Sequence, residues 1–167
     1  SEIWGEHRTG RRLGATVCAR VDGGWIGSYE TYEGYRHRRL LRMRETEEGT
    51  ELVVEDAVHG PAGESASAFF HLAPGFSWEM RDGGWRIAGD ARANAKDIEA
   101  QVTVKTEKVG EHADVLIHQS GDICAYAPEF GKRMKKQVME VRFKLDKGVG
   151  ACGVKMVFRR WEAYAAK

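Results

Sequence analysis

"LVVEDAVHGPAGESASAFFHLAPGF", residues 52–76, is the stretch of sequence that decides the fold. Its histidines and acidic residues are compatible with a functional site, but a His-Gly-Pro turn signal divides it into two apolar-rich halves. Residues 52–58 and 65–74 carry the β-branched and aromatic side chains that strands prefer. We interpret the stretch as two strands joined by a hairpin loop, with His59 at a strand end and His71 among apolar neighbours.

Alternation of apolar and polar side chains with a period of two recurs along the rest of the chain. In FSWEMR, residues 76–81, the apolar Phe76, Trp78 and Met80 alternate with polar residues. A period of two places the apolar side chains on one face of a strand. The other segments that we expect to be strands are residues 15–20, 24–32, 36–45, 84–88, 98–106, 112–118, 137–145 and 153–161.

Turn signals rich in Gly, Asp and Pro separate these segments, and only residues 90–97 and 129–136 are short helical candidates. Many short strands divided by turns are typical of antiparallel sandwiches and barrels. We therefore predict an all-β fold, an antiparallel β-sandwich of about ten strands with little helix. In this interpretation residues 1–167 form a single β-sandwich domain, and a chain of this length can bury a core.

The composition argues against two classes of partner. Lys and Arg number 26 against 25 acidic residues, so the net charge of +1 gives no field that favours nucleic acid. No apolar run approaches the roughly 18 residues that span a bilayer, so we expect no membrane partner. The sequence does not decide between a periplasmic and a cytoplasmic location.

The spacing of cysteine and histidine gives no sign of a metal or cofactor site. Cys18, Cys124 and Cys152 contain no CxxC pair, and the six histidines have neither HxH nor HxxxH spacing. Structural zinc sites and redox motifs depend on such spacings. We therefore expect no metal, no cofactor and free, buried thiols.

The sharpest local feature is the basic stretch RHRRLLRMR, residues 36–44. On a strand, Arg36, Arg38, Arg42 and Arg44 share one face, where their guanidinium groups can fork onto carboxylates or sulfates of an anionic glycan. The alternative is a solvated face whose arginines pair with acids of a neighbouring strand. The acids available for such pairing are Glu45, Glu47, Glu48, Glu51 and Glu55.

Three tyrosines, Tyr29, Tyr32 and Tyr35, fall within the adjacent stretch YETYEGY. Aromatic rings are platforms for sugar faces, and a tyrosine near arginines can have a lowered pKa and act as a base. The alternative is ordinary aromatic packing in and beside a strand. We keep Tyr35 as a candidate glycan-binding residue beside the four arginines.

Four motifs, in their order along the chain, resemble the heparinase II/III-like polysaccharide lyases. The motifs are SEIWGEHRTGRR (1–12), EGYRHRRLLRM (33–43), ELVVEDAVHG followed by FFHLAPGF (51–76), and YAPEFGKRMKKQVMEVRF (126–143). Each is weak alone, but four in sequence form a fairly specific set. The resemblance covers about residues 1–161 and includes the motif position of Tyr35.

The resemblance implies the C-terminal β-sandwich of a larger, two-domain bacterial enzyme. In that family an N-terminal helical toroid and the sandwich together form a cleft for an acidic, uronate-containing polysaccharide. The reaction is β-elimination, in which a base removes the proton beside the uronate carboxylate and an acid protonates the departing oxygen. Proton removal builds negative charge next to the carboxylate, so a neutralising group is needed.

The chain also departs from the family pattern. The histidine-rich "H.D.L.F" strand, the "HN" segment and the toroid are absent, and the usual "HDGY" appears here as YEGY, residues 32–35. We therefore expect a domain that supports the substrate cleft, lacks the catalytic centre and is inactive alone. No catalytic residue is assigned, and the activity of the longer protein stays open.

Two other functional classes remain open, a free-standing glycan-binding sandwich and a structural or assembly module. Each would leave the arginine face in a different environment, bound to sugar or buried against another chain. If strands are missing upstream, the sheet should present an unpaired edge. We expect residues 1–14, or a second copy in a homodimer, to cover that edge.

Overall fold

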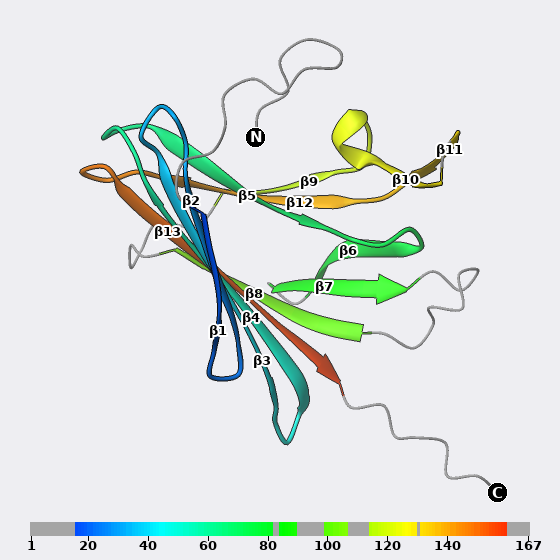
Figure 1. The fold of residues 1–167 in the computed structure, drawn as a ribbon. Helices are drawn as coiled ribbons and strands as arrows, with labels where there is room; N and C mark the ends of the chain where they lie inside the picture. Colours follow the sequence, from blue (N-terminus) through cyan, green and yellow to red (C-terminus); the bar gives the residue numbers. More distant parts are fainter. Residues whose placement is uncertain (1–15, 82–83, 90–98, 107–113, 130, 160–167) are drawn as a thin grey trace, which may run out of the picture.

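The computed structural model describes residues 16–81, 84–89, 99–106, 114–129 and 131–159 (Figure 1). Thirteen strands in this part of the chain pair only in antiparallel fashion, which confirms the predicted all-β class. The strands are β1 (Thr16–Val21), β2 (Gly24–Glu30), β3 (Arg36–Glu45), β4 (Gly49–His59), β5 (Ser65–His71), β6 (Phe76–Arg81), β7 (Gly84–Gly89), β8 (Glu99–Thr106), β9 (Asp114–His118), β10 (Ala125–Glu129), β11 (Lys132–Lys135), β12 (Val138–Lys144) and β13 (Val149–Arg159).

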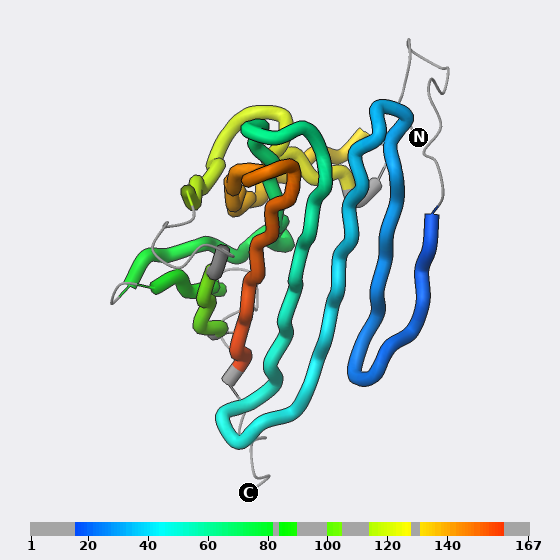
Figure 2. Tube along the Cα trace, turned by 90° about the vertical axis from the view of Figure 1, so that its left-hand side faces the viewer, coloured from blue at the N-terminus to red at the C-terminus, as the bar shows by residue number. Residues whose placement is uncertain are grey.

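Two facing sheets make up the sandwich. The larger sheet has eight strands in the order β1-β2-β3-β4-β13-β8-β7-β6, and the smaller has the order β5-β12-β9. Figure 1 shows the smaller sheet lying over the larger one, with the β10–β11 hairpin continuing to one side. Strands β1 to β4 and β13 run side by side as a broad antiparallel surface (Figure 2).

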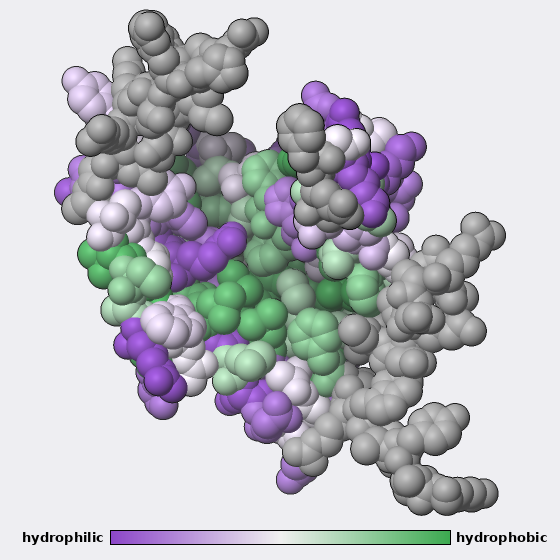
Figure 3. All heavy atoms as spheres, turned by 45° about the vertical axis from the view of Figure 1, so that its right-hand side comes forward, coloured by the Kyte–Doolittle hydropathy of each residue, from purple (hydrophilic) through white to green (hydrophobic). Residues whose placement is uncertain are grey.

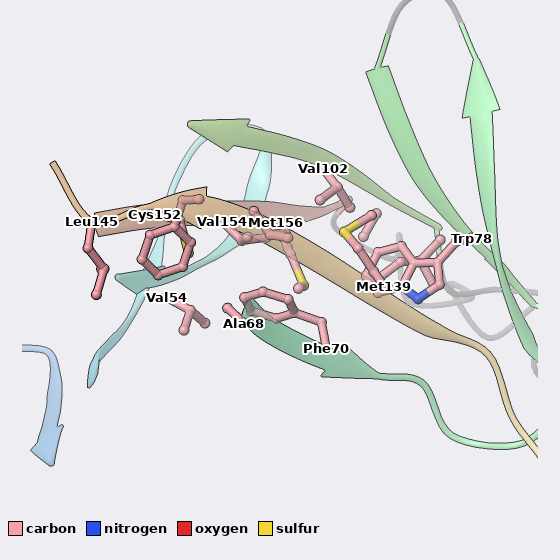
Figure 4. Packing of buried hydrophobic residues seen from close by; sticks show 14 residues of the cluster. Val54, Ala68, Phe70, Trp78, Val102, Met139, Leu145, Cys152, Val154 and Met156 are labelled. Atoms are coloured by element: carbon pink, nitrogen blue, oxygen red, sulfur yellow. The ribbon is translucent and has the colours of Figure 1, made fainter. Parts of the chain in front are cut away.

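The core lies between the inner faces of the two sheets. Val54 and Val154 from the larger sheet are buried, as are Met139 and Val141 from β12 of the smaller sheet. Figure 4 shows side chains of both sheets in this layer, Phe70 among them. Strand alternation puts every second residue in the core, and each fully buried side chain of this kind contributes roughly 1.5–3 kcal/mol.

The larger sheet extends beyond the cover that the smaller sheet provides. On the inner face of β2 and β3, Trp25 and Met43 are 54% and 60% exposed, and Leu41 is also exposed. Trp25 pairs directly with Leu41 across the two strands, so these side chains form one apolar surface. Figure 3 shows apolar residues gathered in the hollowed middle of one face of the molecule, between polar residues on either side.

The stretch at residues 52–76 contains two strands, as predicted, but they do not form a hairpin. β4 pairs with β3 and β13 in the larger sheet, whereas β5 pairs with β12 in the smaller. The connecting loop therefore crosses between sheets, where the Gly60 amide donates to the Gly148 carbonyl at 2.9 Å. An added Cβ at Gly148 would lie 2.7 Å from the Gly60 oxygen, so this crossing needs glycine.

The helix expected at residues 129–136 is wrong. The structure has a β-hairpin there instead, in which Ala125 of β10 pairs with Lys135 of β11. Gly131 takes a positive φ of 76°, which suits the turn between these strands. The other predicted helix, at residues 90–97, lies outside the described residues. The helical structure within the described residues is a single 3₁₀ turn, Asp122–Cys124.

The edges of the larger sheet are β1 and β6. The expected cover from residues 1–14 lies outside the described residues, and the homodimer stays a prediction. Among the described residues, no helix is long and apolar enough to cross a membrane.

Candidate functional site

The four candidate arginines lie on the outer face of the larger sheet. In the register of β3 with β4, Leu41 pairs with the core residue Val54, so the odd-numbered residues of β3 face the smaller sheet. The even-numbered residues point away from it. The predicted sharing of one face by Arg36, Arg38, Arg42 and Arg44 therefore follows from the observed register.

Two of these arginines are held by carboxylates. Arg44 Nε donates to Glu51 at 2.6 Å, and Lys155 Nζ of β13 lies 2.6 Å from the other Glu51 oxygen. Glu51 is only 4% exposed, and the hydrogen bond from Arg44, with that from Lys155, lowers the pKa of its carboxyl. Arg36 Nε donates to Glu30 at 3.0 Å. Cross-strand pairing, the alternative left open by the sequence, therefore accounts for these two.

Arg38 and Arg42 differ from their neighbours because they make no hydrogen bond or ion pair within the described residues. Their Cα atoms are four residues apart on one strand face, roughly 13 Å. Two cationic side chains thus project from the middle of the outer face without a protein anion fixed to them.

A shallow groove of about 450 Å³ runs over this part of the outer face. Its floor is made of the small residues Ala57, Ala151 and Gly153 of the neighbouring strands β4 and β13. Arg38 and Lys155 line the groove, and the acids Glu55 and Asp56 line it as well. Small side chains in the floor leave room for an extended ligand to approach the backbone of the sheet.

Tyr35 is not brought together with the arginine face. It lies before β3, where its hydroxyl donates to the Glu64 carboxylate and its ring packs against Gly60. The hydrogen bond to Glu64, with burial, raises the pKa of Tyr35 above its usual value. The lowered pKa that the sequence suggested is therefore wrong. A carboxylate, and not a guanidinium group, is the neighbour of this hydroxyl.

A second cluster of charged residues escaped the sequence analysis. Asp56 of β4 is 2% exposed and accepts hydrogen bonds from His37 Nε2 at 2.7 Å and Arg39 Nε at 2.7 Å. Arg39 Nη2 adds a third bond at 2.9 Å. Burial acts to raise the pKa of Asp56, but the bonds from His37 and Arg39 outweigh it and hold the pKa below its ordinary value. Asp56 lies on β4, whereas His37 and Arg39 lie on β3, and only the register of the two strands brings them together. No local sequence motif therefore indicates this cluster.

This cluster lies beside an open cleft of about 420 Å³. The cleft lies between the inner faces of β2 and β3 and the edge strand β5, which contributes Ser67. Tyr29 forms one wall, and its ring meets the ring of His37 edge to face at 5.2 Å. The Arg39 guanidinium lies 5.6 Å from the centre of the Phe70 ring. Such cation–π contact helps to fix its orientation.

A third cluster occupies the outer face of the smaller sheet. Glu140 accepts hydrogen bonds from Arg142 Nε, Ser67 Oγ and His118 Nε2, each at 2.7 Å. Its carboxyl is buried, and the bond from Arg142 leads the interactions that lower its pKa to about 2. All of its partners come from the three strands of the smaller sheet. This network joins the three strands, and its Ser67 also lines the cleft beside Asp56.

No group of three or more metal-binding side chains converges within the described residues. All three cysteines are free, and Cys124 and Cys152 are buried. Burial, with the nearby Asp56, raises the pKa of the Cys152 thiol to about 12, so this thiol stays protonated.

Two facing antiparallel sheets, with a groove of mixed charge on one outer face, define the class, an all-β sandwich domain. The heparinase II/III-like, C-terminal family matches residues 1–153, and the chain belongs to this family. The comparison with curated proteins gave no match.

Solved heparinase structures share the fold. The crystal structure of a heparinase III superposes with a TM-score of 0.58 at 12% sequence identity, over 93% of this chain and 22% of that chain. A second heparinase III gives a TM-score of 0.57 at 13% identity, over 92% of this chain and 22% of that one. The chain thus spans about a fifth of the length of these proteins, and at such identities the likeness concerns the fold alone.

Proposed function

We propose that this chain is the C-terminal β-sandwich domain of a larger lyase that cleaves an acidic, uronate-containing polysaccharide by β-elimination. Its role is to line and support the substrate cleft, and the proton-transfer groups come from the rest of the enzyme. The family membership and the short span relative to heparinase III support this assignment. The observation that carries it is the outer-face groove with Arg38 and Arg42 unpaired beside it.

The charges around the groove suit a polyanion of regularly spaced carboxylates. Arg38 and Arg42 project from one strand face and can each fork onto a carboxylate or sulfate. Glu55 opposes the binding of an anion, and Glu51 already neutralises part of the charge of Lys155, so the attraction for an anion comes mainly from Arg38 and Arg42. Individual exposed ion contacts are weak, so affinity for such a chain comes from several contacts together.

The exposed apolar surface on the inner face supports the second half of the proposal. Trp25, Leu41 and Met43 form a contiguous patch on strands that the smaller sheet does not cover. Patches of large apolar side chains mark contact surfaces, since isolated soluble domains rarely expose them. In this proposal the patch packs against the remaining part of the lyase, and the homologous toroid is the partner it fits.

Substitution of both arginines tests the glycan-binding role. Arg38→Ala with Arg42→Ala should weaken binding of alginate, a polyuronate, about tenfold, because two exposed ion contacts of roughly 0.7 kcal/mol each are lost. Titration calorimetry at low and high salt measures the change, and added salt should weaken wild-type binding as well. Lys135→Ala with Lys144→Ala removes the same charge from β11 and β12 and should change affinity less than twofold. Equal losses in the two double variants would contradict the proposal.

Activity assays test the absence of a catalytic centre. The chain alone, incubated with alginate or heparin, should give no absorbance from an unsaturated product, whereas the full-length protein should. Turnover by the chain alone would overturn the assignment of the proton-transfer groups to the rest of the enzyme.

A free-standing glycan-binding sandwich is the second candidate, because the groove is complete within this one chain. In that case the chain alone binds alginate as tightly as the full-length protein, and neither cleaves it. As a lyase domain, the chain binds weakly by itself and the full-length protein turns the polymer over. The same two measurements therefore separate these functions.

A further inference from the structure

The cleft beside Asp56 has the features of a built binding site on the inner face of the larger sheet. Its volume of about 420 Å³ lies within the range of roughly 300–1,000 Å³ that small ligands occupy. It combines an aromatic wall, Tyr29, with two polar side chains, His37 and Arg39, that one buried carboxylate holds in place. It opens on the face of the sheet opposite to the side chains of Arg38 and Arg42, and Asp56, within the sheet, lines both the cleft and the groove.

The hydrogen bond to Asp56 fixes which nitrogen of His37 is available to a ligand. An ionised carboxylate only accepts hydrogen bonds, so His37 Nε2 must carry the proton that reaches Asp56 at 2.7 Å. In the neutral ring the other nitrogen, Nδ1, is then an acceptor. An acceptor on a ring held by a buried acid is suited to a sugar hydroxyl.

Arg39 has N–H donors that are not used in its hydrogen bonds to Asp56. Its Nε and Nη2 atoms bond to Asp56, and a guanidinium has five N–H donors in all. The side chain is 39% exposed although its partner is 2% exposed, so part of the guanidinium faces the cleft. Contact with the Phe70 ring restricts its orientation further. Fixed donors of this kind recognise a carboxylate with less loss of side-chain entropy than a mobile lysine.

We propose that this cleft is a separate binding site for one acidic sugar unit. Arg39 donates to the sugar carboxylate, His37 Nδ1 accepts from a hydroxyl, and the half-exposed ring of Tyr29 packs against the pyranose face. Asp56 touches no ligand and acts as a positioning residue. Tyr35 also lines the cleft, and its hydroxyl donates to the carboxylate of Glu64. The choice of a sugar acid as ligand rests on the proposed function, whereas the location of the site rests on the cleft alone.

Titration of the ¹⁵N-labelled chain with D-glucuronate, and separately with neutral D-glucose, tests this site. Glucuronate should shift the ring nitrogens of His37 and the amide of Tyr29 in a saturable manner, at least fivefold tighter than glucose. A glucuronate-containing tetrasaccharide in a third arm distinguishes a site for a chain end from one for a free monosaccharide. A purely structural cluster would leave the His37 ring signals unmoved in every arm.

Matched variants separate this inference from the proposed function. Tyr29→Ala, a change at a partly exposed wall residue, should weaken glucuronate binding at least fivefold with the fold retained in the ¹⁵N spectrum. Arg38→Ala with Arg42→Ala should leave glucuronate binding within twofold of wild type, even though it weakens alginate binding about tenfold. Equal responses to glucose and glucuronate, or unchanged binding in Tyr29→Ala, would overturn the site in the cleft. Loss of glucuronate binding in the arginine double variant would do so too, by placing the sugar in the outer groove.

Discussion

At the scale of single residues, three buried carboxylates account for the ion pairs of several arginine, lysine and histidine side chains in the sandwich. Glu51, Asp56 and Glu140 are each buried, and each is paired with a cationic side chain, from a neighbouring strand for Glu51 and Asp56 and from the same strand for Glu140. Burial of an unpaired charge is costly, so removing either side of such a cluster is worse than replacing it whole. Among the arginines on the outer face of β3, Arg38 and Arg42 make no ion pair within the described residues, unlike Arg36 and Arg44.

Asp56→Asn should destabilise the fold by about 3 kcal/mol, because it leaves Arg39 partly buried without its bidentate partner. Urea unfolding at neutral pH measures the difference in the free energy of unfolding. Glu55→Gln is the matched control, since this neighbour points to the opposite face and makes no ion pair within the described residues. It should cost less than about 0.5 kcal/mol. Similar losses in both variants would show that Asp56 contributes no specific pairing.

At the scale of strands and loops, the sequence indicates where strands occur but not which strands pair with one another. Alternation places Trp78, Val102 and Val141 on buried faces, as the core confirms, because side-chain direction is a property of each strand by itself. The pairing of β4 and β5 with different sheets depends on contacts far along the chain, and the predicted hairpin failed there. The Asp56 cluster was missed for the same reason, since β3 and β4 register unites His37 and Arg39 with an acid on the next strand.

The Glu140 network makes the smaller sheet sensitive to acid. The ordinary pKa of this carboxyl is 4.5 and its folded pKa is about 2, so its stabilising contribution is complete above pH 4.5 and is lost as the pH falls toward 2. The loss should amount to about 2 kcal/mol, discounted because Arg142 and His118 are partly exposed. Urea unfolding of wild type and Glu140→Gln between pH 6 and 2.5 measures it. The two stabilities should converge at low pH, and parallel curves would contradict this account.

At the scale of the whole molecule, the family and the all-β class could be predicted from the sequence. The distribution of the candidate residues between the faces of the sandwich could not. Four ordered motifs indicated the family that matches residues 1–153. The candidate set of Tyr35 with four arginines is split by the sandwich, because Tyr35 lies at the cleft and the arginines on the opposite face. In β3, leucine and arginine occur on both faces, so its own sequence does not indicate which face meets the second sheet.

The three free thiols allow local opening of the fold to be measured by alkylation. Cys18 lies exposed on β1, whereas Cys124 and Cys152 are buried, and the Cys152 thiol with a pKa of about 12 is a poor nucleophile in the folded state. A pulse of iodoacetamide should therefore alkylate Cys18 first, Cys152 of the core only as fast as the two sheets separate, and Cys124 only as fast as its 3₁₀ turn opens. Mass spectrometry counts the added groups, and immediate triple labelling would mean that the layers part readily without denaturant. The rate of the slow alkylation then gives the rate of local opening, and a partner that docks on this domain should lower it.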